Sequence, residues 1–267
     1  MKKLIYQYFD GNLLPGIEEG IKAMKTYANA IGVEYIFEHN PKYFSGLGKY
    51  NPHFGQFKVL FDDKFKKYDK ILFADTDVFP TDRVLNSKED IFDSYDCDIG
   101  ICTESFQPKW RKKNPNHHIG YNNDEKWAKL VEKHYGWKAP RNEEGLLKVY
   151  NSGVILYNIH NSNKIIKEIV DFNKYQKLVL RSGLSTFYTS DQCYIHAMIC
   201  NPNLNVKEMD HKWNAFVHYI GKETPRPVND MRTKDTNFVH IQLSGVDHFD
   251  RDELWRITNL EKKDWKL

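Results

Sequence analysis

The sequence predicts an α/β protein whose mostly parallel, doubly wound sheet is flanked by helices. Its first part alternates between short apolar runs typical of strands and longer segments with helical apolar spacing. Such alternation produces parallel sheets, because each helix carries the chain back across one face of the sheet. Ligands bind these sheets in the crevice at the carboxyl ends of the strands, so we expect the functional residues there.

The predicted elements follow in chain order. Residues 4–10 form the first strand, residues 13–31 a helix that ends at Gly32, and residues 33–39 the second strand. A helix over 52–67 leads to a buried strand at 70–75, and a fourth strand occupies 97–104. Residues 105–149 are rich in Lys, Asn and Pro, with a helix predicted only at 123–136. The remaining elements are a strand at 149–158, helices at 162–178 and 190–200, and short extended pieces at 204–208 and 237–243.

Composition excludes several classes of protein. The net charge of +3, from 39 basic and 36 acidic residues, is too weak an excess to argue for nucleic acid, and we expect no nucleic-acid partner. No stretch approaches the roughly 18 apolar residues of a membrane span, and the apolar run after Lys3 is too short for a secretory signal. The four cysteines form no CxxC pair, which is typical of reduced thiols. We therefore expect a soluble, cytoplasmic protein; its oligomeric state is left open.

Two aspartates directly follow the third predicted strand, in the segment Lys70-Ile-Leu-Phe-Ala-Asp75-Thr76-Asp77. In an extended chain, side chains two residues apart point the same way, so both carboxylates should reach one point. Their mutual repulsion calls for a cation there. Mg²⁺ and Mn²⁺ prefer oxygen ligands and commonly share them with substrate phosphates. The alternative is a pair of acidic turn residues at the surface.

Four patterns occur in a fixed order along the chain. They are FADTDVFP at 73–80, YNSGVILYN at 150–158, Ser190-Asp191-Gln192, and Phe238-Val239-His240 with Gly245; Trp213-Asn214 is a weaker fifth. In this order they resemble the glycosyltransferases of the GT-A fold, and glycosyltransferase family 8 in particular. The late element departs from the family pattern H-x-x-G-x-x-K-P-W, since Gly245 is displaced and Asp247-His248-Phe249 stands where K-P-W is expected.

The resemblance implies one GT-A domain over residues 1–267. Residues 1–104 would form the half that binds the nucleotide sugar, and residues 105–267 the half that binds the acceptor, with a C-terminal element. The implied reaction moves a hexose or similar sugar from a UDP-sugar donor to a glycan or glycoconjugate acceptor. It would require Mn²⁺ or Mg²⁺ and retain the anomeric configuration.

Residue roles follow from the same resemblance. Asp75, Asp77 and His240 would bind the metal, and Asp191, Gln192 and Asn151 would act at the sugar. The donor would also contact Tyr6, Tyr8, Lys58, Thr76 and Gly245. Gly153 would permit close backbone approach, and Glu104 corresponds loosely to an acidic residue near the acceptor. Ordinary alternatives are helix capping for Asp191, core packing for the two tyrosines and a solvated Lys58.

Three other functions remain as alternatives. A haloacid-dehalogenase-like phosphohydrolase also carries D-x-D at a strand end, but Val78-Phe79-Pro80 fits its motif poorly and no later Asp-Asp pair completes its magnesium site. A nucleotidyltransferase would need a Gly-rich loop after the first strand, where residues 8–16 contain only Gly11 and Gly16. A catalytically inactive carbohydrate- or nucleotide-binding protein is the third.

Overall fold

The computed structural model describes residues 1–41, 52–220, 226–242 and 249–259. At its centre lies a six-stranded sheet with the order β2-β1-β3-β6-β5-β7. The strands are β1 (Lys3–Phe9), β2 (Glu34–His39), β3 (Lys70–Ala74), β5 (Ile99–Thr103), β6 (Tyr150–Asn158) and β7 (Val206–Glu208). β6 runs antiparallel to both its neighbours, and the other pairs are parallel. The predicted α/β class with a mostly parallel central sheet is therefore confirmed.

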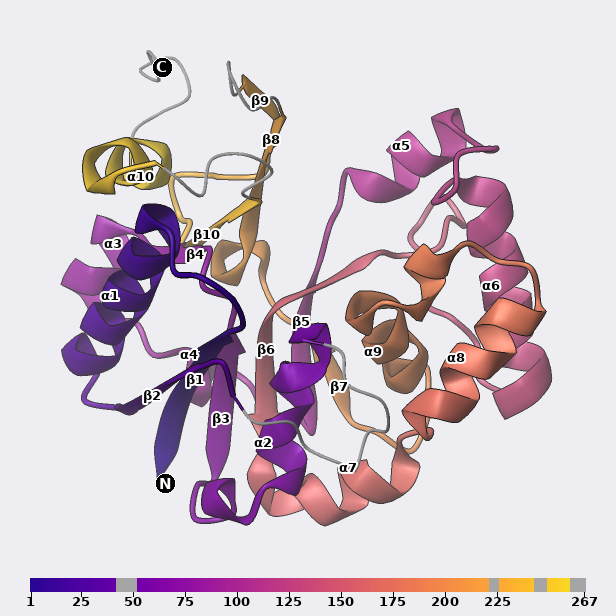
Figure 1. The fold of residues 1–267 in the computed structure, drawn as a ribbon, viewed down its shortest axis with the longest axis horizontal. Helices are drawn as coiled ribbons and strands as arrows, with labels where there is room; N and C mark the ends of the chain where they lie inside the picture. The colour runs from indigo at the N-terminus through magenta and orange to yellow at the C-terminus, as the bar shows by residue number, and fades with distance from the viewer. Residues whose placement is uncertain (42–51, 221–225, 243–248, 260–267) are drawn as a thin grey trace.

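Helices cover both faces of this sheet (Figure 1). Because successive strand residues point to opposite faces, Leu4 and Tyr6 join one apolar cluster while Ile5 joins the other. The Ile5 face packs against α1 (Pro15–Ala30), α3 (Asp82–Ser87) and α4 (Ile91–Ser94). The opposite face packs against α2 (Lys58–Phe61), α6 (Tyr121–Tyr135), α7 (Ser162–Glu168), α8 (Phe172–Arg181) and α9 (Asp191–Ile199).

A second sheet begins directly after the aspartate pair. Its four strands have the order β4-β10-β8-β9. They are β4 (Val78–Pro80), β8 (Ala215–Ile220), β9 (Arg226–Asp230) and β10 (Phe238–Gln242), and α10 (Arg251–Asn259) packs beside them. The short turn between β3 and β4 thus joins the two sheets, and it contains Asp75 and Asp77.

Three predicted segments differ in detail from the structure. The helix expected over 52–67 is broken into short helical pieces around α2, since Asp62 is extended and its side chain accepts a hydrogen bond from the N–H of Lys64. The helix expected over 162–178 is divided into α7 and α8, where Ile169 is extended and Asp171 caps the second helix. An unpredicted helix, α5 (Gln107–Lys113), lies within the Lys-rich segment.

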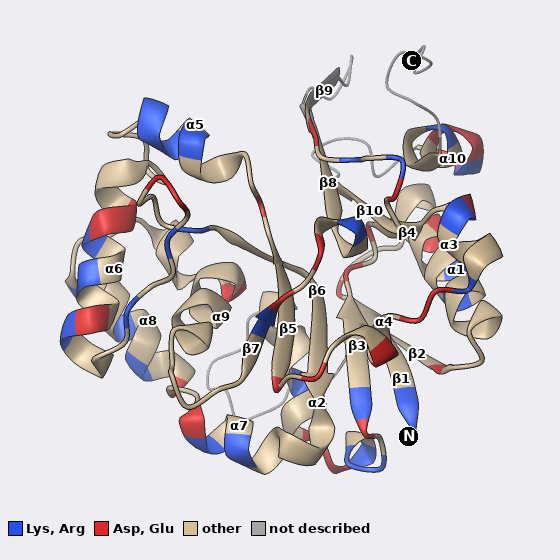
Figure 2. Cartoon of the chain, turned by 180° about the vertical axis from the view of Figure 1, so that it is seen from behind, with Lys and Arg blue, Asp and Glu red and all other residues tan. Residues whose placement is uncertain are grey.

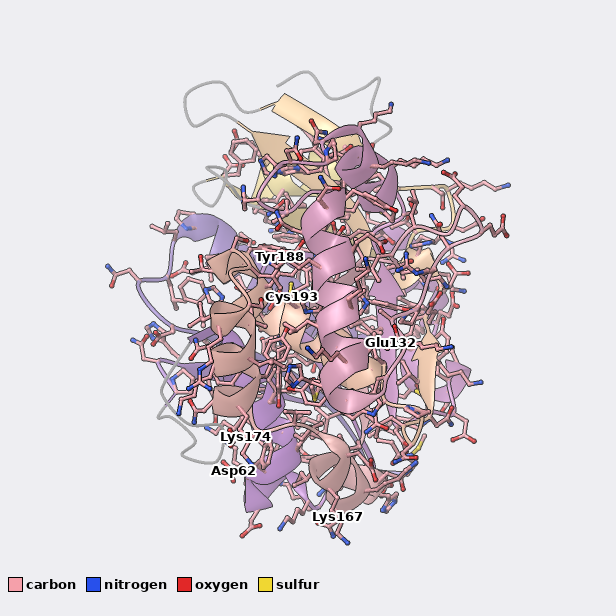
Figure 3. The ribbon with its side chains drawn as sticks, turned by 90° about the vertical axis from the view of Figure 1, so that its right-hand side faces the viewer. Asp62, Glu132, Lys167, Lys174, Tyr188 and Cys193 are labelled. Atoms are coloured by element: carbon pink, nitrogen blue, oxygen red, sulfur yellow. The ribbon has the colours of Figure 1, made fainter. Side chains whose placement is uncertain are left out.

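The helices on the far side of the sheet enclose a buried ion pair. Arg111 donates to Asp124 at 2.8 Å, and the hydroxyl of Tyr188 donates to the same carboxylate oxygen at 2.7 Å. Figure 3 shows Tyr188 and Cys193 beside α6, where both side chains are buried. This network ties α5 and α6 to the segment that leads into α9.

Charged residues are spread over the helices, with Lys and Arg interspersed with Asp and Glu in the view of Figure 2. All four cysteines are buried and unpaired, as expected of reduced thiols. Within the ranges that the structure describes, no helix combines the length and apolar character needed to cross a bilayer.

Candidate functional site

Asp75 and Asp77 lie in a turn rather than in the extended segment that we predicted. The N–H of Val78 donates to the carbonyl of Asp75 at 3.2 Å and closes the turn. The backbone of Asp75 is held on both sides, because its N–H donates to the carbonyl of Gly153 at 2.8 Å and its carbonyl accepts from Nε2 of Gln7 at 2.9 Å. The carboxylates converge through this turn, not through the two-residue repeat of a strand.

His240 lies beside the two aspartates. One possible ligand atom from each of Asp75, Asp77 and His240 lies within 4.8 Å of the others. Nε2 of His240 is 3.2 Å from Oδ1 of Asp77. Strand pairing produces this arrangement, since β10 pairs with β4 and sets His240 opposite Val78. The structure therefore brings together all three residues predicted to bind a metal.

The electrostatics of this cluster favour a cation. Burial, with the nearby charge of Asp77 as a second cause, raises the pKa of Asp75 to about 8. Burial lowers the pKa of His240, but the charge of Asp77 and its hydrogen bond outweigh that effect and raise it. Two oxygen ligands and one imidazole nitrogen are a donor set that suits Mg²⁺ or Mn²⁺. The residues present therefore fit a divalent ion.

Asn151 and Gly153, from the start of β6, surround the other side of His240. Oδ1 of Asn151 lies 3.1 Å from Nδ1 of His240, and Nδ2 of Asn151 donates to Oε1 of Glu104 at 2.9 Å. A Cβ on Gly153 would lie 2.2 Å from Cε1 of His240. The close approach expected at Gly153 is therefore a contact within the protein. It is made by the side chain of His240, one of the three residues of the candidate metal site.

Asp191 and Gln192 begin α9. Ser190 caps the helix, and Oδ2 of Asp191 accepts hydrogen bonds from Nε2 of Gln56 at 2.7 Å and Oγ of Ser152 at 3.0 Å. Burial raises the pKa of Asp191, and its charge in turn contributes to the raised pKa of Asp75. Nε2 of Gln192 donates to the carbonyl of Tyr150 at 2.6 Å. The cap of α9 is therefore Ser190, while the side chain of Asp191, the first residue of the helix, is held by Gln56 and Ser152.

Tyr6 and Tyr8 on β1 and Lys58 on α2 were predicted to contact the donor, and in the structure all three contact other residues of the protein. The hydroxyl of Tyr6 and Nζ of Lys58 both donate to Oε2 of Glu38, each at 2.8 Å. Within the described part of the chain, neither has a hydrogen bond or ion pair to Asp75 or Asp77. The ring of Tyr8 stacks on Phe73 with centroids 5.7 Å apart.

Thr76 in the aspartate turn and Gly245 near the end of the chain were also predicted to contact the donor. The backbone of Thr76 is covered by α1, where a Cβ on Gly20 would lie 1.7 Å from the carbonyl oxygen of Thr76. Gly245 lies outside the described residues. The turn is therefore enclosed by the helix on one face of the sheet.

Four residues at the site were not predicted. Gln7 holds the backbone of Asp75, Gln56 and Ser152 hold the side chain of Asp191, and Oδ1 of Asn214 lies 3.1 Å from Nδ1 of His240. No local pattern distinguishes Gln56 from any other polar residue of a helical segment. Asn214 belongs to the Trp213-Asn214 pattern, and Ser152 to the segment at 150–158, so both could have been found from those motifs.

Comparison with known proteins finds similarity in fold. No model of a known protein family matches the sequence, and no curated protein matches it. A glycosyltransferase involved in glycosylation of the major capsid of PBCV-1 shares 11% identity, with 90% of this chain and 92% of that chain covered and a TM-score of 0.44. Mouse xyloside xylosyltransferase 1 shares 17% identity, with 81% and 87% covered and a TM-score of 0.45.

A third similar structure is the galactosyltransferase LgtC in complex with donor and acceptor sugar analogs. It shares 14% identity, with 80% of this chain and 75% of that chain covered and a TM-score of 0.41. All three proteins are glycosyltransferases by their printed descriptions. At such identities and scores, the likeness concerns overall fold and carries no information on the reaction.

Proposed function

We propose that the protein is a divalent-metal-dependent glycosyltransferase. It moves a hexose or similar sugar from a UDP-sugar donor to a glycan acceptor, with retention of the anomeric configuration. The observation that carries this proposal is the convergence of Asp75, Asp77 and His240 within 4.8 Å at the carboxyl end of β3. The choice of UDP and of retention rests on the sequence patterns shared with glycosyltransferase family 8.

Asp75, Asp77 and His240 would hold the ion. When bound, Mn²⁺ or Mg²⁺ supplies positive charge that neutralises the diphosphate of the donor as the sugar leaves. The residues contribute rigidity, because Asp75 is held through its backbone by Gly153 and Gln7. A site held in this way binds the diphosphate without first having to rearrange.

Asp191 and Gln192 would face the reacting sugar. The amide N–H groups of Gln192 point to acceptors of the protein, at 2.6 Å from the carbonyl of Tyr150 and 3.4 Å from Oε1 of Glu104. The amide oxygen of Gln192 is therefore the atom left to face a substrate. A carbonyl dipole aimed at the anomeric carbon stabilises the positive charge that develops there. Gln56 and Ser152 keep the carboxylate of Asp191 in place beside it.

Thermal unfolding with nucleotides tests the donor and the metal together. A ligand that binds the folded state alone raises stability by mass action, by about 2.7 kcal/mol at a hundred times its Kd. We expect UDP to raise the melting temperature when Mn²⁺ is present and not when the ion is chelated. Stabilisation by inorganic phosphate, together with phosphate release from phosphate esters, would instead favour the phosphohydrolase.

Two variants test whether the Mn²⁺-dependent stabilisation by UDP requires Asp77. Asp77→Ala should lose the Mn²⁺-dependent stabilisation by UDP, because it removes one of three ligands. Asp63→Ala is the matched control, since the side chain of Asp63 is 87% exposed on the protein surface. An Asp77→Ala protein that keeps the full Mn²⁺-dependent shift would refute the metal site.

A further inference from the structure

We propose that the groove between α6 and α8 is a docking site for an acidic amphipathic helix of a partner protein. The groove lies on the outer side of the helical layer, away from β4 and β10, which flank the candidate metal site (Figure 1). It is open to solvent and has a volume of about 540 Å³. The inference is independent of the proposed function, because it uses no residue of the candidate metal site.

The floor of the groove is apolar. Leu130 and Tyr135 of α6 and Leu178 of α8 line it, and all three are half-buried. In the core below them the two helices are fixed to each other, since the indole N–H of Trp127 donates to the hydroxyl of Tyr175 at 2.9 Å. A groove whose walls are already fixed binds a partner without first losing conformational freedom.

The α8 rim of the groove is cationic. Lys174, Lys177 and Arg181 line it, at spacings of three and four residues that place them along one face of the helix. All three are exposed, and within the described ranges none of them is in an ion pair. α8 contains no acidic residue, and the carboxylate of Asp171 before it caps the helix by accepting from the backbone N–H of Lys174. The positive charge of this rim is therefore left for a ligand.

The α6 side adds a further cation. Lys126 reaches the end of the groove, since a Cβ on Gly183 would lie 3.6 Å from its Nζ. Asp124 and Glu125 of α6 are in ion pairs with arginines outside the groove. Figure 3 shows Glu132, the third acidic residue of α6, on the side of that helix turned away from α8. Among the described residues, no carboxylate lines the groove.

An apolar floor beside a cationic rim fits an amphipathic helix with acidic flanks. Both walls are helices whose backbone groups are bonded internally, so the groove offers no strand edge to an extended peptide. A helix satisfies its own backbone and can set apolar side chains on the floor at every third or fourth position. Lys174 and Arg181 are about 10 Å apart along the axis at about 1.5 Å per residue, which matches two turns of such a helix. Its acidic residues would pair with the rim and steer the encounter.

Two other anionic partners fit these observations less well. A helix that binds a bilayer turns its apolar face outward, whereas here the apolar residues lie at the bottom of a groove and the exposed rim is charged. An anionic glycan would pair with the rim but would leave its polar hydroxyls against the aliphatic side chains of Leu130 and Leu178. Both partners are separate outcomes of the test.

Fluorescence anisotropy with a labelled peptide tests the proposal. The probe is a peptide of about 15 residues made of leucine, alanine and glutamate, with leucines along one helical face and glutamates on both sides of them. We expect it to bind the full chain, and to bind more weakly as salt screens the charges of the rim. A matched peptide with lysine in place of glutamate should not bind. Failure of the acidic peptide to bind would overturn the proposal, as would equal binding of an acidic peptide with serine in place of leucine.

Charge reversal locates the binding site. The double variant Lys177→Glu and Arg181→Glu should weaken peptide binding by about tenfold or more, because attraction at the rim becomes repulsion. The control is the double variant Lys112→Glu and Lys113→Glu, which changes the net charge equally at exposed positions outside the groove. Equal loss of affinity in both would show attraction to the overall charge and contradict the proposal.

Two leucines of α8 provide a matched pair for the floor. Leu178→Gln should weaken peptide binding by about tenfold, whereas Leu180→Gln should not, because Leu180 is 49% exposed and does not line the groove. Equal affinities would exclude the groove as the site.

Vesicles of phosphatidylglycerol and heparin complete the test. If the acidic peptide does not bind and the double variant of Lys177 and Arg181 loses binding to vesicles or to heparin, the site belongs to a membrane or to an anionic glycan and the proposal is wrong. The Mn²⁺-dependent stabilisation by UDP should be the same in all these variants, since they lie away from the candidate metal site. Its absence from the wild type would refute the proposed function and leave the docking site untouched.

Discussion

Gly153 on β6 lies directly against the imidazole of His240 on β10. A Cβ on Gly153 would be 2.2 Å from Cε1 and 2.6 Å from Nδ1 of the ring. β6 belongs to the six-stranded sheet and β10 to the four-stranded sheet. The candidate site therefore depends on a contact between two sheets that requires a residue without a side chain.

Gly153→Ala should displace His240 while leaving the fold intact. We expect Mn²⁺-dependent UDP affinity to fall by about tenfold or more, and the free energy of unfolding to fall by about 1–3 kcal/mol from overpacking. Titration calorimetry and urea unfolding measure the two effects. Gly136→Ala is the control, because it strains a residue at φ +73° where an added Cβ would meet nothing. Equal UDP affinity in both variants would contradict the prediction.

Gly20→Ala should destabilise the protein although it lies within α1. An alanine normally stabilises a helix by about 1 kcal/mol relative to glycine. Here the added Cβ would lie 1.7 Å from the carbonyl oxygen of Thr76, so the helix or the aspartate turn must move. We expect a loss of stability by urea unfolding and weaker Mn²⁺ binding. A more stable variant would show that α1 does not press on the turn.

Gln192→Ala should lower turnover far more than donor affinity. Its amide oxygen is proposed to act on charge that develops only during the reaction, and removal of one such group typically lowers kcat by about 10²- to 10³-fold. Steady-state rates of UDP release, compared with UDP affinity and melting temperature, separate the effects. An unchanged kcat would remove Gln192 from the reacting centre.

Asp98 should stabilise the fold in a pH-dependent way. Burial alone would raise its pKa, but hydrogen bonds from Nζ of Lys164, the N–H of Asn205 and Nδ2 of Asn161 hold the pKa below its ordinary value. Such a carboxylate stabilises the folded state above its unfolded pKa of about 3.9, and the stabilisation is lost as the pH falls through the folded pKa.

Asp98→Asn should therefore lower the free energy of unfolding by about 1.5–3 kcal/mol at neutral pH. The difference from the wild type should narrow as the pH falls below about 4, because the unfolded chain then takes up a proton at Asp98 before the folded protein does. Urea unfolding as a function of pH measures it, with the exposed Asp63→Asn as the reference. A difference that does not change with pH would exclude this ionic contribution.

Much of the fold follows from local patterns. Alternation along β1 assigns Leu4 and Tyr6 to one face of the sheet and Ile5 to the other, and an apolar run places Asp75 at the end of a buried strand. The breaks at Asp62 and at Ile169 were missed, because apolar spacing continues across them and the local caps that end each helix are weaker signals.

The sequence by itself determined the α/β class, the strand that carries the aspartates and, through ordered motifs, which residues to examine. The tertiary structure decided that Asp75 and Asp77 converge through a turn, that Gln56 holds Asp191, and that Asn214 faces His240. The last of these contacts depends on how β8 pairs with β10 in the second sheet, and the contact between Gln56 and Asp191 joins segments 135 residues apart in the chain. Pairing between distant segments is a property of the packed chain, and local periodicity does not encode it.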